Sequence, residues 1–180
     1  AAVNQNGLAL RYVPLDLKSP EICLAAVTQD VDALDLVPDG MRTERIFRAA
    51  VTKHRYPLYR VPNDERRSRR ICHTAVVENG NALQDVPYKK REPSICLAAV
   101  TKNGLNLRHV PAIWYTPEIC LAAVTENGLA LRHVYPKDNR TPEICLAAVT
   151  NDPNALKHVP EVKRTGKIYL ALVTRHGYLL

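Results

Sequence analysis

The chain has 180 residues, of which 46% are hydrophobic and only 6% aromatic, and it carries a formal net charge of +7. No stretch approaches the roughly 18 to 20 consecutive apolar residues of a transmembrane helix, so the sequence predicts no membrane span. No signal or transit peptide is recognisable either.

A valine recurs along the whole chain at intervals of 24 or 25 residues, in most cases after two alanines. It is found at Val3, Val27, Val51, Val76, Val100, Val124, Val149 and Val173. A fixed period of this length is typical of stacked repeat arrays. We therefore expect an all-α, right-handed α-solenoid-like array of about seven and a half two-helix repeats. It would form one domain over residues 1–180, and because both ends fall inside repeats, we expect a slice of a longer protein.

Capping residues predict where the first helix of each repeat begins. The best matches to this signal are Ser19-Pro20-Glu21, Thr116-Pro117-Glu118 and Thr141-Pro142-Glu143. Serine or threonine suits the N-cap, proline suits the first helical position, and glutamate favours the positive end of the helix dipole. The apolar stretch that follows predicts a helix of about ten residues that packs between its neighbours.

The second helix of each repeat is expected to be short and to follow a sharp corner. Asn127-Gly128, taken alone, indicates a helix end with glycine in a left-handed conformation. The last complete repeat has Asp152-Pro153 instead, which is typical of a helix start. We therefore expect both helices to share one corner, with the second helix over residues 129–134 or 154–159. A proline and a short loop would then lead to the next repeat.

The five cysteines occupy one position of the repeat. They are Cys23, Cys72, Cys96, Cys120 and Cys145. Equivalent atoms of stacked helices lie roughly 8–10 Å apart, whereas a disulfide needs Cα atoms within about 7 Å. We therefore expect free, buried thiols and a reducing compartment such as a cytoplasm. Targeting signals would lie outside this slice.

The motif PEICLAAVTxNGLALRHVP, in which x is any residue, resembles that of a family of short repeats of unknown function. It is clearest around Val100, Val124 and Val149, and it is degenerate around Val51 and Val76. Similar arrays occur in protist proteins and in bacterial proteins such as those of Legionella, where some belong to candidate secreted effectors. The resemblance covers essentially the whole chain. It implies an all-helical repeat fold and transfers no catalytic or binding residue.

Motifs of familiar catalytic and cofactor sites are missing from the sequence. It contains no dinucleotide or P-loop glycine pattern, no serine in a nucleophile elbow and no C-x-x-C pair. The recurring His109, His133 and His158 would form a line rather than a tetrahedral metal site. We therefore expect no enzyme, no catalytic residue, no cofactor and no metal.

The positive charge is concentrated in the two degenerate repeats. Residues 40–93 hold 13 Lys and Arg against 6 Asp and Glu, whereas the remainder holds 12 against 12. The glutamate of the first helical turn becomes Arg45 and Arg70, and the leucine after cysteine becomes Arg48 and His73. Cations at a helix N-terminus oppose the dipole, so their repeated use there is typical of a functional site.

These substitutions predict a site for an anion or for an acidic partner. Its candidate residues are Arg45, Arg48, Arg66, Arg67, Arg69, Arg70 and His73. Unpaired N–H groups at a helix start would assist such binding. The alternative is decay of the repeat, with solvated charges that pair locally with Glu44, Asp64 and Glu65.

Two further features are weaker candidates. A secondary basic ladder would follow the second helices through Arg108, His109, Arg132, His133, Lys157 and His158. It would suit an acidic peptide or a phosphate backbone, or it is only the solvated face of these helices. Trp114 and Tyr115 would form an interface anchor, or they cover the ends of adjacent helices.

The function that the sequence favours is a non-enzymatic helical-repeat scaffold that binds another protein carrying an acidic patch. One alternative is a binder of nucleic acid or of another phosphate-bearing ligand through residues 40–93. Against it, few aromatic residues lie among the basic ones, and no known nucleic-acid module is present. A third possibility is an architectural spacer in a larger assembly or secreted effector, with the rest of its own longer chain as partner.

Overall fold

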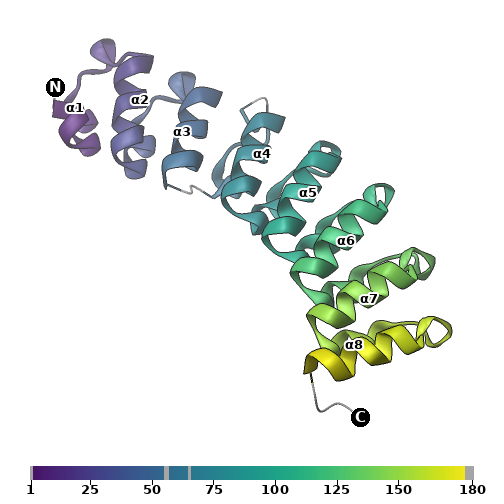
Figure 1. Cartoon of the computed structure of the whole chain (residues 1–180). Coiled ribbons are helices and arrows are strands. Elements are labelled where there is room, and N and C mark those ends of the chain that lie inside the picture. The colour runs from purple at the N-terminus through teal and green to yellow at the C-terminus, as the bar shows by residue number, and fades with distance from the viewer. Residues whose placement is uncertain (1, 55–56, 65, 177–180) are drawn as a thin grey trace. The chain divides into compact units, whose positions relative to one another are not determined.

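A computed structural model describes residues 2–54, 57–64 and 66–176. Within these ranges every regular element is a helix (Figure 1), so the expected all-α repeat array is confirmed, while its handedness stays a prediction. The chain divides into two compact units, Ala1–Glu78 and Asn79–Leu180. No helix in the described part of the chain has both the length and the apolar character needed to cross a membrane.

The α-helices are the first helices of the repeats. They are α1 (Ala2–Gln5), α2 (Pro20–Gln29), α3 (Glu44–His54), α4 (Arg69–Glu78), α5 (Pro93–Lys102), α6 (Pro117–Glu126), α7 (Pro142–Asn151) and α8 (Gly166–His176). The hydroxyl of Thr141 accepts a 3.3 Å hydrogen bond from Ile144 N, and Ser19 and Thr116 cap their helices in the same way. The capping residues thus begin these helices as predicted.

The second helices of the repeats are 3-10 helices. They are η1 (Gly7–Tyr12), η3 (Val31–Leu36), η6 (Gly80–Asp85), η8 (Gly104–His109), η10 (Gly128–His133) and η12 (Pro153–His158). Each begins one residue before the predicted start, and its short length suits the tighter 3-10 geometry. In η10, Ala130 and Leu131 are buried while Arg132 is exposed, so this helix has an inner and an outer face.

Each repeat also contains a three-residue 3-10 segment that the two-helix prediction missed. These segments are η2 (Leu15–Leu17), η4 (Asp39–Met41), η5 (Leu58–Arg60), η7 (Tyr88–Lys90), η9 (Ala112–Trp114), η11 (Lys137–Asn139) and η13 (Glu161–Lys163). All follow a proline, whose fixed φ suits the entry into such a turn. The connection between repeats is therefore helical rather than an open loop. Only η5 is placed differently, because it lies at the second-helix position of its repeat: Val61 follows it directly, as Val86 follows η6.

The corner between the two helices of a repeat is a single residue. Asn127 donates its backbone N–H to the Ala123 carbonyl at the end of α6, and its side-chain oxygen accepts from Leu129 N at the start of η10. With φ at −145° Asn127 is extended, and Gly128 is not left-handed, so that interpretation of the glycine was wrong. Glycine is needed for space instead, because a Cβ on Gly128 would lie 2.3 Å from the Ala148 carbonyl oxygen.

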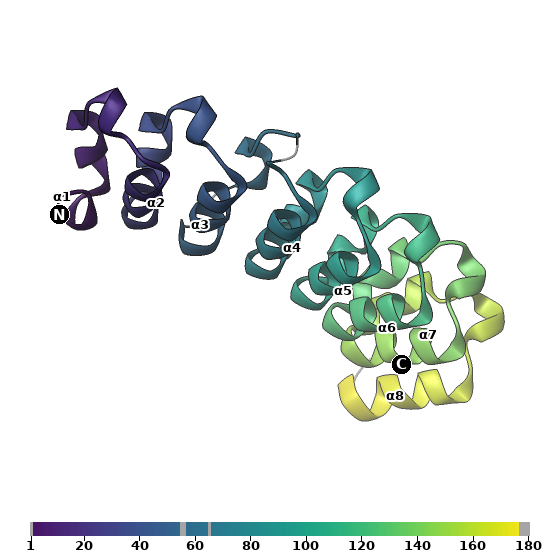
Figure 2. The ribbon, with the colours of Figure 1, turned by 90° about the horizontal axis from the view of Figure 1, so that it is seen from above.

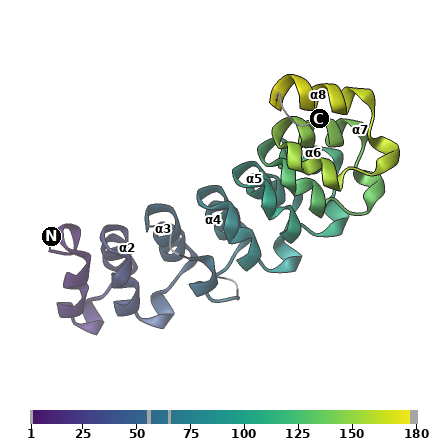
Figure 3. The ribbon, with the colours of Figure 1, turned by 90° about the horizontal axis from the view of Figure 1, so that it is seen from below.

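The core of each unit lies between its α-helices and its 3-10 helices. Within either unit, Figures 2 and 3 show the α-helices in one layer and the 3-10 segments in a second layer. The inner face of α6 consists of Ile119, Cys120, Ala123 and Val124, all of which are buried. The five cysteines are free and buried as predicted, and burial raises the pKa of Cys120 to about 11.

A column of mostly basic side chains, each one residue before an α-helix cap, binds backbone carbonyl oxygens, and three of its members (Lys18, Arg91 and Arg140) reach the next repeat. Arg140 donates from Nε to the Val134 carbonyl oxygen (3.2 Å), from Nη2 to Arg132 (3.2 Å) and from Nη1 to His158 in the next repeat (2.6 Å). Equivalent hydrogen bonds to carbonyl oxygens are made by Lys18, Arg42, Arg67, Arg91, Tyr115 and Arg164. We call these seven residues the arginine column. They satisfy carbonyl groups that a helix end leaves without partners.

Candidate functional site: grooves on the exposed face of the α-helices

Each long α-helix leaves one face outside the core, and this face varies between repeats. In α6 it carries the exposed Glu118 and Thr125 and the half-buried Leu121. In α3, Arg45 takes the place of the glutamate and Arg48 that of the leucine. These two substitutions alter the surface, whereas in the core of α3 Phe47 replaces the buried cysteine of α6.

An open groove between α2 and α3, which we call the basic groove, has a volume of about 290 Å³. It is lined by Leu24, Thr28, Arg45, Arg48, Ala49, Thr52 and Lys53. Within the described ranges, none of its three cations, Arg45, Arg48 and Lys53, makes a side-chain hydrogen bond or an ion pair. Three positive charges therefore meet on one cavity without a compensating partner there.

A neighbouring cavity of about 370 Å³ shares Arg45 with the basic groove and also contacts Glu21. A backbone hydrogen bond at the start of α2 and the Ser19 side chain lower the pKa of Glu21, and the charge of Arg45 adds to this effect. Glu21 is therefore ionised at neutral pH. It moderates the field of Arg45 on one side, whereas Arg48 and Lys53 line only the basic groove.

The equivalent groove between α6 and α7, which we call the leucine groove, is apolar and acidic instead of cationic. Its volume is about 440 Å³, and it is lined by Leu121, Thr125, Glu143, Leu146, Ala147, Thr150 and Asn151. Glu143, Leu146 and Asn151 replace the three cations of the basic groove position by position. One scaffold thus presents a cationic groove in one unit and an apolar, acidic groove in the other.

Arg70 and His73 continue the basic surface on α4. They occupy the positions of Arg45 and Arg48 in the next repeat, and both are exposed. The helices α3 and α4 pack against each other within the same unit (Figure 1). The four residues therefore belong to one face, although only Arg45 and Arg48 line the basic groove.

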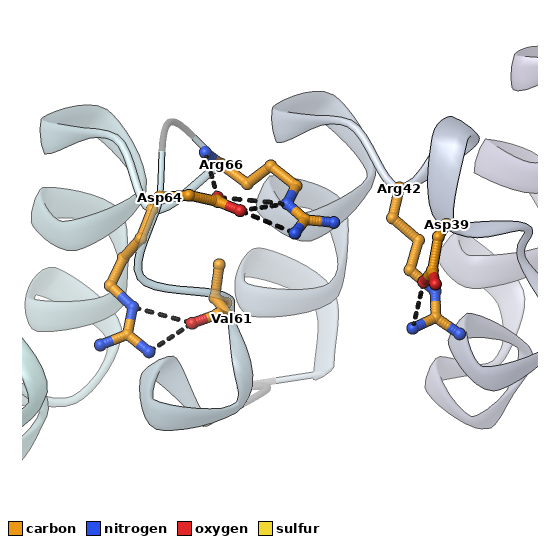
Figure 4. A network of polar contacts seen from close by, with 6 residues as sticks. Asp39, Arg42, Val61, Asp64 and Arg66 are labelled. Carbon is orange, nitrogen blue, oxygen red and sulfur yellow. Dashed lines mark hydrogen bonds and ion pairs between the residues drawn. The ribbon is translucent and has the colours of Figure 1, made fainter.

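The arginines of the loop before α4 have local partners. Arg66 forms a 2.7 Å ion pair with Asp64, whose pKa it lowers, so local pairing accounts for this residue (Figure 4). Arg67 belongs to the arginine column and donates to the carbonyl oxygens of Val61 (2.8 Å) and Tyr59 (3.1 Å). Arg69 is exposed as the first residue of α4. We therefore leave Arg66 and Arg67 out of the candidate site.

The other acidic residues of the pairing alternative play little part. Glu44 makes no ion pair within the described ranges, and Glu65 lies outside them. Asp39 instead pairs with Arg42 at 3.1 Å, on the exposed side of the arginine column (Figure 4). The ion pairs thus neutralise arginines of the loops, while the exposed face of α3 with Arg45 and Arg48 keeps its positive charge.

The secondary ladder follows η8, η10 and η12, which pack side by side. Arg132 Nε donates a 2.9 Å hydrogen bond to His133 Nε2, and Arg108 makes the same bond to His109. Burial lowers the pKa of all three histidines of the ladder, and adjacent cationic side chains lower it further. These imidazoles are therefore neutral near pH 7, which leaves the ladder with less charge than its six residues suggest.

The aromatic pair after η8 is not an exposed anchor. Trp114 is half-buried at the end of η9. Tyr115 is half-buried too, and its hydroxyl donates a 3.2 Å hydrogen bond to the Leu107 carbonyl oxygen. Burial also raises the pKa of Tyr115. Tyr115 therefore takes the place of an arginine in the column.

Sequence reasoning missed Lys53 and the arginine column. Lys53 follows Thr52 at the end of a helix, where lysine is common, so only comparison with Asn151 reveals it. The column has a clear signal, because a basic residue precedes the helix cap in six of the seven repeats. A count of charges does not reveal this signal, because it ignores the position of each charge within the repeat.

A family model described as a domain of unknown function (DUF4116) matches residues 1–42 and 116–163, which is half of the chain. The chain belongs to this family. The matched residues exclude residues 43–115, which contain α3, α4 and α5, so the basic groove combines a matched wall, α2, with an unmatched one. No curated protein and no solved structure matches the chain. In the described part of the chain, no three His, Cys, Asp or Glu residues are grouped so that they could hold a metal ion.

Proposed function

We propose that the chain is a non-enzymatic helical-repeat scaffold that binds an acidic segment of another protein in the basic groove. The observation that carries the proposal is the set of Arg45, Arg48 and Lys53, three cations that line one cavity and form no ion pair with a described residue. The fold does not require them, because the equivalent pair of helices, α6 and α7, forms the leucine groove with Glu143, Leu146 and Asn151 at these positions.

The walls of the basic groove favour a peptide over a bare ion. Leu24 and Ala49 supply apolar surface between the cations, while Thr28 and Thr52 supply hydroxyl groups. An acidic segment with aliphatic residues would satisfy both kinds of surface, because complementary charge adds specificity while apolar burial adds affinity. The five free thiols favour a reducing compartment, so we infer that binding takes place in a cytoplasm.

A swap variant tests the proposal by giving the basic groove the residues of the leucine groove. It combines Arg45→Glu, Arg48→Leu and Lys53→Asn, and we expect it to fold because α7 carries these residues already. Binding of a fluorescent peptide rich in aspartate and leucine is measured by anisotropy. Exposed charge pairs contribute about 0.2–1 kcal/mol each, so the swap should weaken binding by about tenfold or more.

The matched control changes the net charge equally at exposed sites elsewhere, through Lys89→Asn, Lys102→Asn and Lys137→Glu. This control should bind the acidic peptide almost as well as the native chain. Equal loss in both variants would show that only net charge matters and would contradict the groove. Tighter binding of a DNA or RNA oligonucleotide, with a steep loss between 50 and 200 mM salt, would favour the nucleic-acid alternative instead.

A further inference from the structure

A row of partly exposed leucines crosses the α-helices of the unit Asn79–Leu180. It consists of Leu97, Leu121, Leu146 and Leu170, one from each of the helices α5 to α8, and we call it the leucine stripe. The first three side chains are half-buried, and Leu170 is 62% exposed. The stripe turns its apolar surface away from the core, which isoleucine, cysteine, alanine and valine fill in α5, α6 and α7, and Ile168 and Leu172 in α8.

The fold does not need leucine at these positions. Arg48 occupies the position in α3 and His73 occupies it in α4, yet both helices form and each buries four residues on the equivalent inner face. In α3 that face is formed by Ile46, Phe47, Ala50 and Val51. Since packing tolerates arginine and histidine there, four successive leucines indicate a surface kept apolar for another purpose.

The widest part of the stripe is the leucine groove between α6 and α7. Leu121, Leu146 and Ala147 form its apolar walls, and Glu143 stands at its edge. Glu118 occupies the same position on α6, and both carboxylates are exposed. Neither makes a side-chain hydrogen bond or an ion pair with any described residue. The groove therefore combines an apolar floor with unneutralised negative charge along one rim.

We propose that the leucine stripe docks an amphipathic helix of another protein that carries a basic edge. Neighbouring packed helices lie about 8–10 Å apart, while residues seven apart on one helix are separated by about 10.5 Å. Apolar residues at heptad spacing on the bound helix therefore meet successive leucines of the stripe. Lysine or arginine along one edge then meets Glu118 and Glu143, in the manner of other helix-in-groove complexes.

This second surface is independent of the basic groove and selects the opposite charge. A synthetic helical peptide with leucine at heptad spacing and lysine along one edge is the probe, and its binding to the intact chain is measured by fluorescence anisotropy. The double variant Leu121→Arg with Leu146→Arg places arginine at the position that Arg48 occupies in α3. Its affinity for the peptide should be at least tenfold lower than that of the native chain. Unchanged thermal unfolding of this variant establishes that the loss does not come from misfolding.

Two further comparisons define the chemistry of the occupant. Glu118→Gln with Glu143→Gln should weaken the lysine-edged peptide several-fold and abolish its advantage over a glutamate-edged peptide. The swap variant of the basic groove copies the residues of the leucine groove, so it should bind the lysine-edged peptide at least as tightly as the native chain does. Equal binding by the leucine-to-arginine variant, or no preference for the lysine edge in the native chain, would overturn the proposal whether or not the basic groove binds acidic peptides.

Discussion

The guanidinium of Arg140 donates a 2.6 Å hydrogen bond from Nη1 to the carbonyl oxygen of His158, one repeat further along the chain. Arg140 is only 9% exposed, and its other two bonds hold carbonyl groups of its own repeat. Arg91 makes the same forward bond, at 2.7 Å, to the carbonyl oxygen of His109. Arg140 and Arg91 thus join successive repeats through hydrogen bonds to backbone carbonyl oxygens. Such a bond does not depend on which side chain the accepting residue carries.

Replacement of Arg140 by methionine should destabilise the fold strongly. The change keeps apolar volume but leaves three carbonyl groups without their donor, and we expect a loss of about 2–4 kcal/mol in the free energy of unfolding. Urea unfolding followed by circular dichroism measures it. Arg140→Tyr should cost less, because Tyr115 fills the equivalent position with a hydroxyl donor. A methionine variant as stable as the native chain would contradict this role.

The substitution Gly128→Ala should destabilise the chain for lack of space. The added Cβ would meet the Ala148 carbonyl oxygen at 2.3 Å, so a backbone must move, at a cost of about 1–3 kcal/mol. The matched control is Gly40→Ala, whose Cβ meets no atom within 4 Å. That control should be neutral or slightly stabilising in thermal unfolding. Equal effects of the two changes would exclude close approach as the reason for the glycine.

Stability should fall as the pH is lowered from about 7 to about 5. Burial and nearby cations keep the pKa values of His109, His133 and His158 below their unfolded value near 6.5. As the pH falls, the histidines of the unfolded chain therefore bind protons before those of the folded chain. The free energy of unfolding then decreases until the pH lies below the pKa values of the folded chain. Thermal unfolding at a series of pH values measures the effect. A triple His→Gln variant should lose most of this dependence, and an undiminished dependence would rule out the histidines as its source.

The fold followed from the sequence wherever the signal is local. Thr141 and Ser19 begin helices because capping involves residues only three apart. The 3-10 character of the second helices did not follow, because six residues with an apolar face suit either kind of helix. The role of Arg140 was missed because one of its acceptors, the His158 carbonyl, lies 18 residues away, and a solved fold is needed to bring them together.

The candidate site was only partly predictable. Arg45 and Arg48 were found because they break a repeated pattern at surface positions, and the structure brings them to one groove. Arg67 looked equivalent because a charge count does not separate a side chain that binds carbonyl groups from one that faces solvent. Lys53 escaped notice because its position in the repeat already varies, with Asn151 as one example.

The single-residue corner at Asn127 dictates where this chain can change in length. A residue inserted there would shift the following 3-10 helix by one position, which is about 120° at three residues per turn, and turn its buried face outward. Val124 and Val134, like Val149 and Val159, are separated by the same ten positions across the corner. The extra residue of the longer repeats lies instead between Val134 and Thr141. Insertions of a tag or a new binding segment will therefore be accommodated after the second helix and rejected at the corner.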